Sequence, residues 1–154
     1  MNFKAEASPP ASAQPKTPME FDTKVAIIIL DDLAVWQKLN VTAFLATGIA
    51  GAVPGAMGEP YIDAAGRTHA RLLGQPMMVY QADSAGLLRA FRQGIERELT
   101  RAVYVRAMFS TGHDQANREV FLKEPADAPD LVGLAVRGPK KAVDKAVKGL
   151  SLHG

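Results

Sequence analysis

Two carboxylates, a tryptophan, a lysine and an asparagine stand close together near the start of this 154-residue chain. Asp31 and Asp32 come directly after the apolar run VAIIIL, and Trp36, Lys38 and Asn40 follow at once. A junction between a buried strand and a helix is where α/β proteins commonly place ligands and chemistry. We therefore take this junction as the first candidate for a binding or catalytic site.

Each of these side chains also has a structural interpretation. Asp31 or Asp32 can cap the next helix by accepting from its free N–H groups, or can orient Lys38 or bind a ligand amine. Lys38 is either a solvated cation or an anion-binding group at a helix start. Trp36 either plugs the helix start or forms the wall of a pocket. Asn40, if partly buried, needs a partner in the adjacent loop or in a ligand.

Four further polar residues are candidates for ligand binding. Arg106 follows a predicted strand, and His113 lies close behind it, so both are expected near the edge occupied by the first junction. Arg137 and Lys140, within RGPKKAVDK, suit a contact with an anion or an RNA backbone, or a solvated basic face. The histidines lack metal-ligand spacing, and GIAGAVPGAMG follows a helix instead of preceding one. We therefore predict neither a metal nor a cofactor.

Composition restricts the possible functions. The chain has no cysteine, which excludes disulfides, thiolate nucleophiles and zinc held by cysteine. A net charge of +2 without a basic block argues against a dedicated nucleic-acid binder. The sequence contains neither a secretory signal nor an apolar run of about 18 residues. We expect a cytoplasmic protein that does not enter membranes.

Residues 1–23 are rich in Ala, Ser and Pro and predict a disordered leader, so residues 24–154 are expected to form one domain. Strands are predicted at 24–30, 76–82, 101–108 and in DLVGLAVRG, with a hairpin around DAAG and an extended C-terminal end. Strands that alternate with helices predict a single three-layer α/β/α domain on a mixed sheet.

The predicted helices have the following apolar faces and caps. After Asp32, the expected buried stripe consists of Val41, Phe44, Leu45, Gly48 and Ile49. A second helix is expected to start at a Ser84 cap, with Leu88, Phe91, Ile95 and Leu99 on one face. STGHDQANREVFLKE predicts a third helix capped by Ser110, Thr111 or Asp114, and PKKAVDKAVKG predicts a fourth.

Three stretches resemble a bacterial family of small proteins of unknown function that is similar in fold to the type-2 peptidyl-tRNA hydrolases. They are LDDLAVWQKLNVTAFLATG, MMVYQADSAGLLRAFRQGIERELTRAVYVRA and LAVRGPKKAVDKAVKGLSL. The resemblance implies a hydrolase-like fold and a homodimer. The hydrolases' catalytic lysine, glutamine and histidine align with Leu39, Ala43 and Ala46, and their aspartate aligns with Ala107. The catalytic residues are therefore not retained.

Three hypotheses remain open from the sequence. The first is a non-hydrolytic protein that binds a small or anionic ligand at the edge of the first strand and first helix. The second is an enzyme that acts on peptidyl- or aminoacyl-tRNA with a rearranged site, and the third is a homodimer without a ligand. Because the hydrolase residues are replaced, we favour the first hypothesis over an enzyme.

Overall fold

The computed structural model describes residues 21–154. Most of the predicted leader therefore lies outside the described residues. Thr23, which we assigned to that leader, is the first residue of strand β1, and its pairing with Pro139 sets where the sheet begins.

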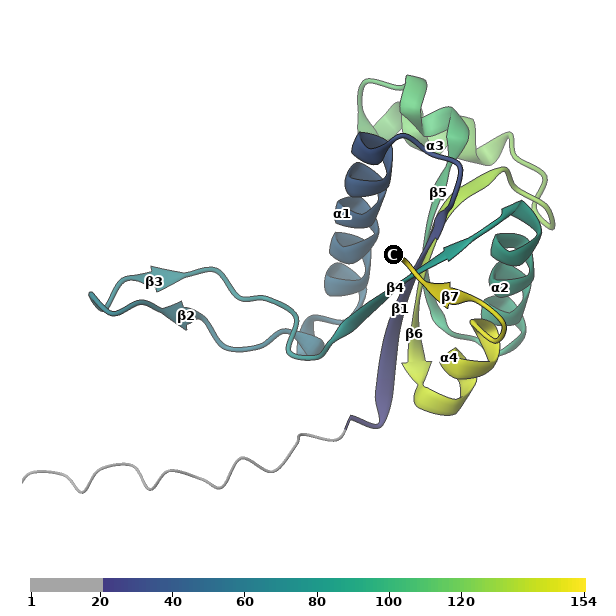
Figure 1. Ribbon diagram of the computed structural model, residues 1–154. Coiled ribbons are helices and arrows are strands. Elements are labelled where there is room, and N and C mark those ends of the chain that lie inside the picture. Colours follow the sequence, from purple (N-terminus) through teal and green to yellow (C-terminus); the bar gives the residue numbers. More distant parts are fainter. Residues whose placement is uncertain (1–20) are drawn as a thin grey trace, which may run out of the picture.

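A mixed five-stranded sheet forms the centre of the domain (Figure 1). Its strand order is β5-β6-β1-β4-β7. β1 pairs in parallel with β4, while β6 pairs antiparallel with both β1 and β5, and β7 pairs antiparallel with β4. The bounds are Thr23–Leu30 (β1), Met77–Ala82 (β4), Thr100–Val105 (β5), Leu131–Pro139 (β6) and Ser151–Leu152 (β7). β1, β4 and β5 thus point the same way, and their carboxyl ends meet at one edge.

Helices cover both faces of this sheet (Figure 1). Helix α1 packs on β5, β6 and β1 on one face, and helices α2 and α4 pack on the other. Helix α3 packs beside the short 3₁₀ helix η2, which follows β5. The bounds are Val35–Ala52 (α1), Ser84–Glu96 (α2), Arg106–Ser110 (η2), Asp114–Leu122 (α3) and Lys140–Ala146 (α4). The predicted mixed α/β arrangement is confirmed.

The core lies around β1, because this strand has a neighbour on each side and helices above and below. Ile27, Ile28 and Ile29 are almost completely buried, as a continuous β-branched run predicts for a central strand. On the α1 side, Gly133 of β6 lets the helix approach closely. A Cβ at this position would lie 2.4 Å from Val41 Cγ1.

Two apolar faces differ from their prediction. Phe44 and Gly48 belong to the expected buried stripe of α1, but both are exposed, and the buried residues of α1 are Val41, Leu45 and Ile49. Ile95 of α2 is also exposed. The stripe is narrower than predicted because α1 packs on the sheet along one row of side chains, spaced four residues apart.

Three predicted helix caps were also wrong. Ala34 precedes α1, and its N–H donates to Gln37 Oε1 at 3.0 Å, so neither Asp31 nor Asp32 caps the helix. The Asp31 N–H instead donates to the Ala82 carbonyl and extends the pairing of β1 with β4. Asp83, the residue before Ser84, caps α2 by accepting from Gly86.

His113 caps α3 in place of the three predicted residues. Its Nδ1 accepts from the Ala116 N–H at 3.2 Å, so the ring does what a Ser or Asp side chain usually does at this position.

Residues 57–74 form an arm that leaves the body on the side of the sheet covered by α1 (Figure 1). The arm follows the short 3₁₀ helix η1 (Pro54–Ala56) and carries the strands β2 (Tyr61–Ile62) and β3 (Thr68–His69), which confirms the predicted hairpin. At its tip, Gly66 adopts a φ of +81°, which suits glycine in a tight turn.

Candidate functional site

A groove lined by aromatic and polar residues lies where α1 begins and β5 ends. Its cavity measures about 330 Å³ and continues into a second cavity of about 260 Å³. We call this region the aromatic groove. Its lining in the first cavity is Trp36, Asn40, Phe44, Tyr104, Met108, Phe109, Thr111, Gly112, His113, Asp114 and Asn117. The groove therefore includes the start of α1, where the sequence placed a candidate site, while its other walls come from β5, η2 and the start of α3.

Four aromatic side chains form the apolar part of the groove. The rings of Trp36 and Phe109 meet edge to face with centroids 5.8 Å apart, and Tyr104 lies 5.3 Å from Phe109 and 6.0 Å from Phe44. Trp36 is 61% exposed, so it forms a wall of the groove instead of a buried plug. Burial raises the pKa of the Tyr104 hydroxyl, and the phenol therefore remains protonated at neutral pH.

The polar part of the groove comes from α1 and from the start of α3. Because His113 Nδ1 accepts from Ala116, the neutral ring carries its hydrogen on Nε2, which makes that atom a donor. Thr111 Oγ1 contacts the Asn117 side chain and donates to the Met108 carbonyl at 2.9 Å. Asn40 is exposed and lines the groove, and no side-chain hydrogen bond within residues 21–154 involves it. Its amide is therefore available to a ligand.

The charges in the groove neutralise each other. Asp114 lies 3.0 Å from Arg118, one turn further along α3. The lining of the two cavities contains Arg118 but no lysine. An arrangement of four rings with neutral donors and acceptors suits a planar, uncharged molecule better than a free anion.

The structure brings only some of the sequence-predicted site residues together. Trp36, Asn40 and His113 line the aromatic groove. Lys38 lies on another side of α1, where its Nζ is 3.1 Å from Nε2 of His153. Arg106 makes an ion pair with Asp130 at 3.2 Å outside the groove.

Asp31 contributes to a separate cavity of about 360 Å³ between the end of β4 and the start of α2. Asp83 also lines this cavity, but its carboxylate is already used as the cap of α2. Arg89 reaches the Lys148 carbonyl at 3.4 Å. Asp83 and Arg89 of this cavity therefore already make hydrogen bonds within the domain.

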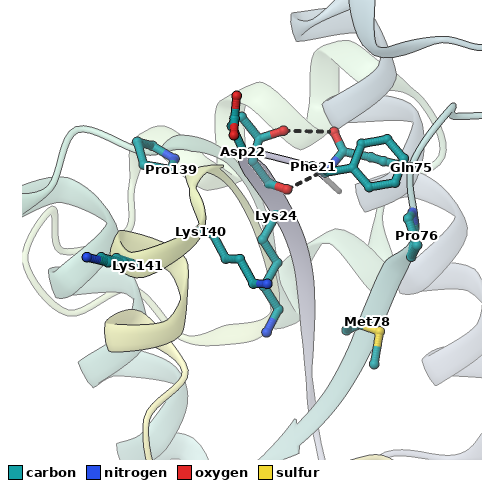
Figure 2. A pocket seen from close by; sticks show the side chains of 10 residues that line it. Phe21, Asp22, Lys24, Gln75, Pro76, Met78, Pro139, Lys140 and Lys141 are labelled. Atoms are coloured by element: carbon teal, nitrogen blue, oxygen red, sulfur yellow. Dashed lines mark hydrogen bonds between the residues drawn. The ribbon is translucent and has the colours of Figure 1, made fainter. Parts of the chain in front are cut away.

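A larger cavity of about 700 Å³ opens at the opposite edge of the sheet, between the starts of β1 and β4 and the start of α4 (Figure 2). We call it the lysine cavity, because Lys24, Lys140 and Lys141 line it. Figure 2 shows Lys141 pointing away from the other two lysines. Lys24 is committed to Asp144, 2.7 Å away, and this hydrogen bond raises the pKa of Lys24.

Arg137, the other predicted residue at this edge, holds the wall of the lysine cavity together. Its guanidinium donates to Gln75 Oε1 at 3.1 Å and to Thr23 Oγ1 at 3.2 Å. Gln75 also donates to the Thr23 carbonyl, and these contacts join β6, β1 and the segment before β4. Arg137 is therefore a structural residue, and Lys140 is the predicted cation that remains open to the cavity.

Several groove residues were missed from the sequence, among them Phe44, Tyr104, Phe109 and Asn117. Phe44 was assigned to the core because it lies three residues after Val41, which is a core spacing. Tyr104 gave a signal, since it alternates with Val103 and Val105 in a strand, but the sequence does not show which element covers that face. Phe109 lies in η2, and Asn117 lies in α3, which packs beside η2. The placement of both residues therefore depends on the path of η2.

Two features are absent from the described part of the chain: a cluster of metal-binding side chains and a helix that could cross a membrane. No group of three or more His, Asp or Glu side chains in residues 21–154 is placed to hold a metal ion. Over the same residues, no helix has the length and apolar character needed to cross a membrane.

The chain belongs to the family DUF2000, described as a protein of unknown function, whose model matches residues 23–154. It is also similar to the solved structure of a protein of unknown function from Agrobacterium tumefaciens strain C58. The two share 47% sequence identity with a TM-score of 0.84, and the match covers 88% of this chain and 100% of that one. None of the curated proteins matches this chain.

Proposed function

We propose that this protein binds a small, planar, uncharged molecule in the aromatic groove. The observation that carries this proposal is the meeting of four aromatic rings with the Asn40 amide and the His113 ring at the carboxyl edge of β1 and β5. Stacking on rings such as Trp36 and Tyr104 supplies affinity through buried apolar area. Hydrogen bonds to Asn40 and to His113 Nε2 supply orientation and specificity.

The charge of the groove argues for a neutral ligand over the anion also considered from the sequence. Lys38, the cation expected beside Asn40, is turned toward His153. Arg118 is paired with Asp114, so its charge is largely compensated. An anion would therefore enter the groove without a free cation to compensate its lost hydration.

The proposal of a hydrolase-like fold and activity rests on the three resembling stretches of sequence. Lys38 stands one position before the aligned catalytic lysine, and it is the group that a rearranged site would use. Ala107 replaces the aligned carboxylate, however, so the proton-handling group is missing at that position. We therefore rank peptidyl-tRNA hydrolysis below ligand binding.

A thermal-shift screen of small planar metabolites tests the binding proposal. A compound that binds the folded state at 100 times its Kd stabilises it by about 2.7 kcal/mol, which is readily measured. The decisive variant is His113→Asn, because asparagine still caps a helix but removes the Nε2 donor. We expect this variant to raise the Kd of the compound about tenfold. The melting temperature of the free variant should stay within about 2 °C of that of the wild type.

Matched variants separate the groove from other sites. Trp36→Ala should also weaken binding, since it removes one wall of the groove. Gln115→Ala, on the exposed surface of α3 outside the groove lining, should leave binding unchanged. If a compound binds and none of the groove variants changes its affinity, the proposal is wrong, and Lys140→Ala then tests the lysine cavity.

Cleavage of a peptidyl-tRNA substrate by the wild-type protein would instead favour the hydrolase. That activity should disappear in Lys38→Ala and rise in Ala107→Asp, because the second change restores the aligned carboxylate.

A further inference from the structure

The arm exposes apolar side chains that no other segment of residues 21–154 covers. Tyr61, Ile62 and Leu72 are each more than half exposed. Apart from the contacts of Met57 and Gly74 with η1 at its base, the hydrogen bonds of the arm lie within the arm, for example from the Gly58 N–H to the Leu72 carbonyl at 2.8 Å. An isolated two-stranded hairpin is at best marginally stable in water, so an arm with this composition needs a surface to lie on.

Helix α1 and the sheet beside it expose further apolar side chains on the side from which the arm leaves. Val35 and Leu39, one turn apart, are exposed on α1, and Met77 is exposed at the start of β4. Met77 is paired with Val25 and therefore points to the same side of the sheet as α1. Because α1 packs on β5, β6 and β1, the β4 part of this face lies beside the helix and not under it. We call Val35, Leu39 and Met77 the α1–β4 face.

We propose that the chain forms a symmetric dimer in which the arm of each protomer lies on the α1–β4 face of its partner. The arm leaves the body on the side of this face and extends beyond α1 (Figure 1), where a partner would stand. A two-fold axis pairs each arm with the other protomer's face, so both apolar surfaces are covered at once.

The exposed area is what a stable dimer needs. The six apolar residues of the arm and the α1–β4 face are between 39% and 73% exposed. At about 200 Å² of accessible surface for a large apolar residue, they leave ~710 Å² open on each protomer. A standard interface takes about 800 Å² from each partner, of which about 65% is apolar in homodimers.

This interface leaves the aromatic groove open. Asn40 and Phe44, four residues apart, line the groove from one row of α1, while Val35 and Leu39 form another row. The dimer and the proposed ligand site are therefore independent, and either can be wrong without the other.

Sedimentation equilibrium of the full chain is the first test, and we expect twice the mass of one chain at micromolar concentration. In the decisive variant, residues 59–71 are replaced by Asn-Gly, a two-residue turn that joins the hydrogen-bonded residues Gly58 and Leu72. This variant should be a monomer. If it does not fold, the double change Tyr61→Ser and Ile62→Ser, which keeps the arm, should raise the dimer Kd at least about tenfold.

Leu39→Ser should have the same effect from the other side of the interface. The matched control is Leu122→Ser on α3, because Leu122 is even more exposed but lies outside the proposed interface. It should leave the dimer unchanged.

Cross-linking tests the contact itself, since the chain has no cysteine of its own. A chain with Ile62→Cys is mixed with a mass-tagged chain with Leu39→Cys, and a short bis-maleimide is added. We expect a product that contains one chain of each kind. A monomeric wild-type protein, a dimer that survives shortening of the arm, or the absence of the mixed product would each overturn the proposal.

Discussion

Lys38 Nζ lies 3.1 Å from His153 Nε2 and so connects the start of α1 to the end of the chain. His153 Nδ1 lies 2.8 Å from the Gly154 carbonyl, and its N–H therefore donates there while Nε2 accepts from the lysine. The His153 backbone N–H donates to Val79 and continues the pairing of β7 with β4. This contact gives Lys38 a role in the fold, whereas the sequence suggested either a solvated cation or an anion-binding group.

Lys38→Ala should lower the free energy of unfolding by about 0.5–1.5 kcal/mol, because it removes a half-buried hydrogen bond. Urea denaturation of the two proteins measures the difference. Lys141→Ala is the matched control, since Lys141 points into solvent and should change stability by less than about 0.5 kcal/mol. Equal stability of the Lys38 variant and the wild type would mean that the contact contributes nothing in solution.

Phe44 and Phe91 should differ strongly when each is replaced by alanine, although the sequence suggested that both anchor the core. Phe91 is 7% exposed, and its loss should cost about 3–5 kcal/mol through lost burial and a cavity. Phe44 is 55% exposed and contacts Tyr104 at the groove, so its loss should cost about 1–2 kcal/mol. Thermal or urea unfolding compares the two variants, and a similar loss for both would contradict the exposed position of Phe44.

The order of elements was predictable from local signals, while the exposed faces were not. The run from Val25 to Leu30 specifies a buried central strand by its own composition, and the DAAG turn specifies the hairpin. Which side of α1 is buried depends on the neighbouring strand, where Gly133 leaves room for Val41 and Leu45. That contact joins residues about 90 positions apart, and no local pattern encodes it.

Two glycines should respond in opposite ways to replacement by alanine. At Gly133 a methyl group would come within 2.4 Å of Val41 Cγ1 and 2.9 Å of Leu45 Cδ1, so α1 must shift and stability should fall by about 1–3 kcal/mol. At Gly51, near the end of α1, nothing lies within 4 Å of the added methyl group. Gly51→Ala should therefore raise stability by about 0.5–1 kcal/mol. Differential scanning calorimetry measures both changes.

Asp63 should titrate at unusually low pH. The hydrogen bond to His69 and the backbone N–H of Arg67 lower the pKa of this carboxyl from its ordinary value of 3.8 to about 2. Because the folded pKa is depressed, the carboxylate supports the turn of the arm at pH values above 3.8, and this support is lost as the pH falls through about 2. A carbon-detected NMR titration of the Asp63 carboxyl measures the midpoint.

The control for this titration is His69→Phe, which removes the first of these hydrogen bonds. Its midpoint should move upward, toward 3.8. A wild-type midpoint already at 3.8 would show that the turn is not formed in solution.

The candidate site was predictable in position but only partly in its members. Trp36 and Asn40 follow β1 in the sequence and remain at its end in the structure, and His113 joins them because η2 turns the chain back toward α1. Lys38 lies between Trp36 and Asn40 in the sequence, but the helical rotation of about 100° per residue carries it to another side. Arg106 is used in an ion pair that depends on the distant Asp130.

The place of β1 in the sheet has a consequence for synthesis on the ribosome. β1 emerges early, but one of its partners, β4, starts at Met77, and the other, β6, ends at Pro139. Until β6 has left the exit tunnel, one side of the most apolar segment of the nascent chain has no strand to pair with. We therefore expect productive folding to begin only after β6 has emerged, and we expect the VAIIIL segment to be a binding site for chaperones before then.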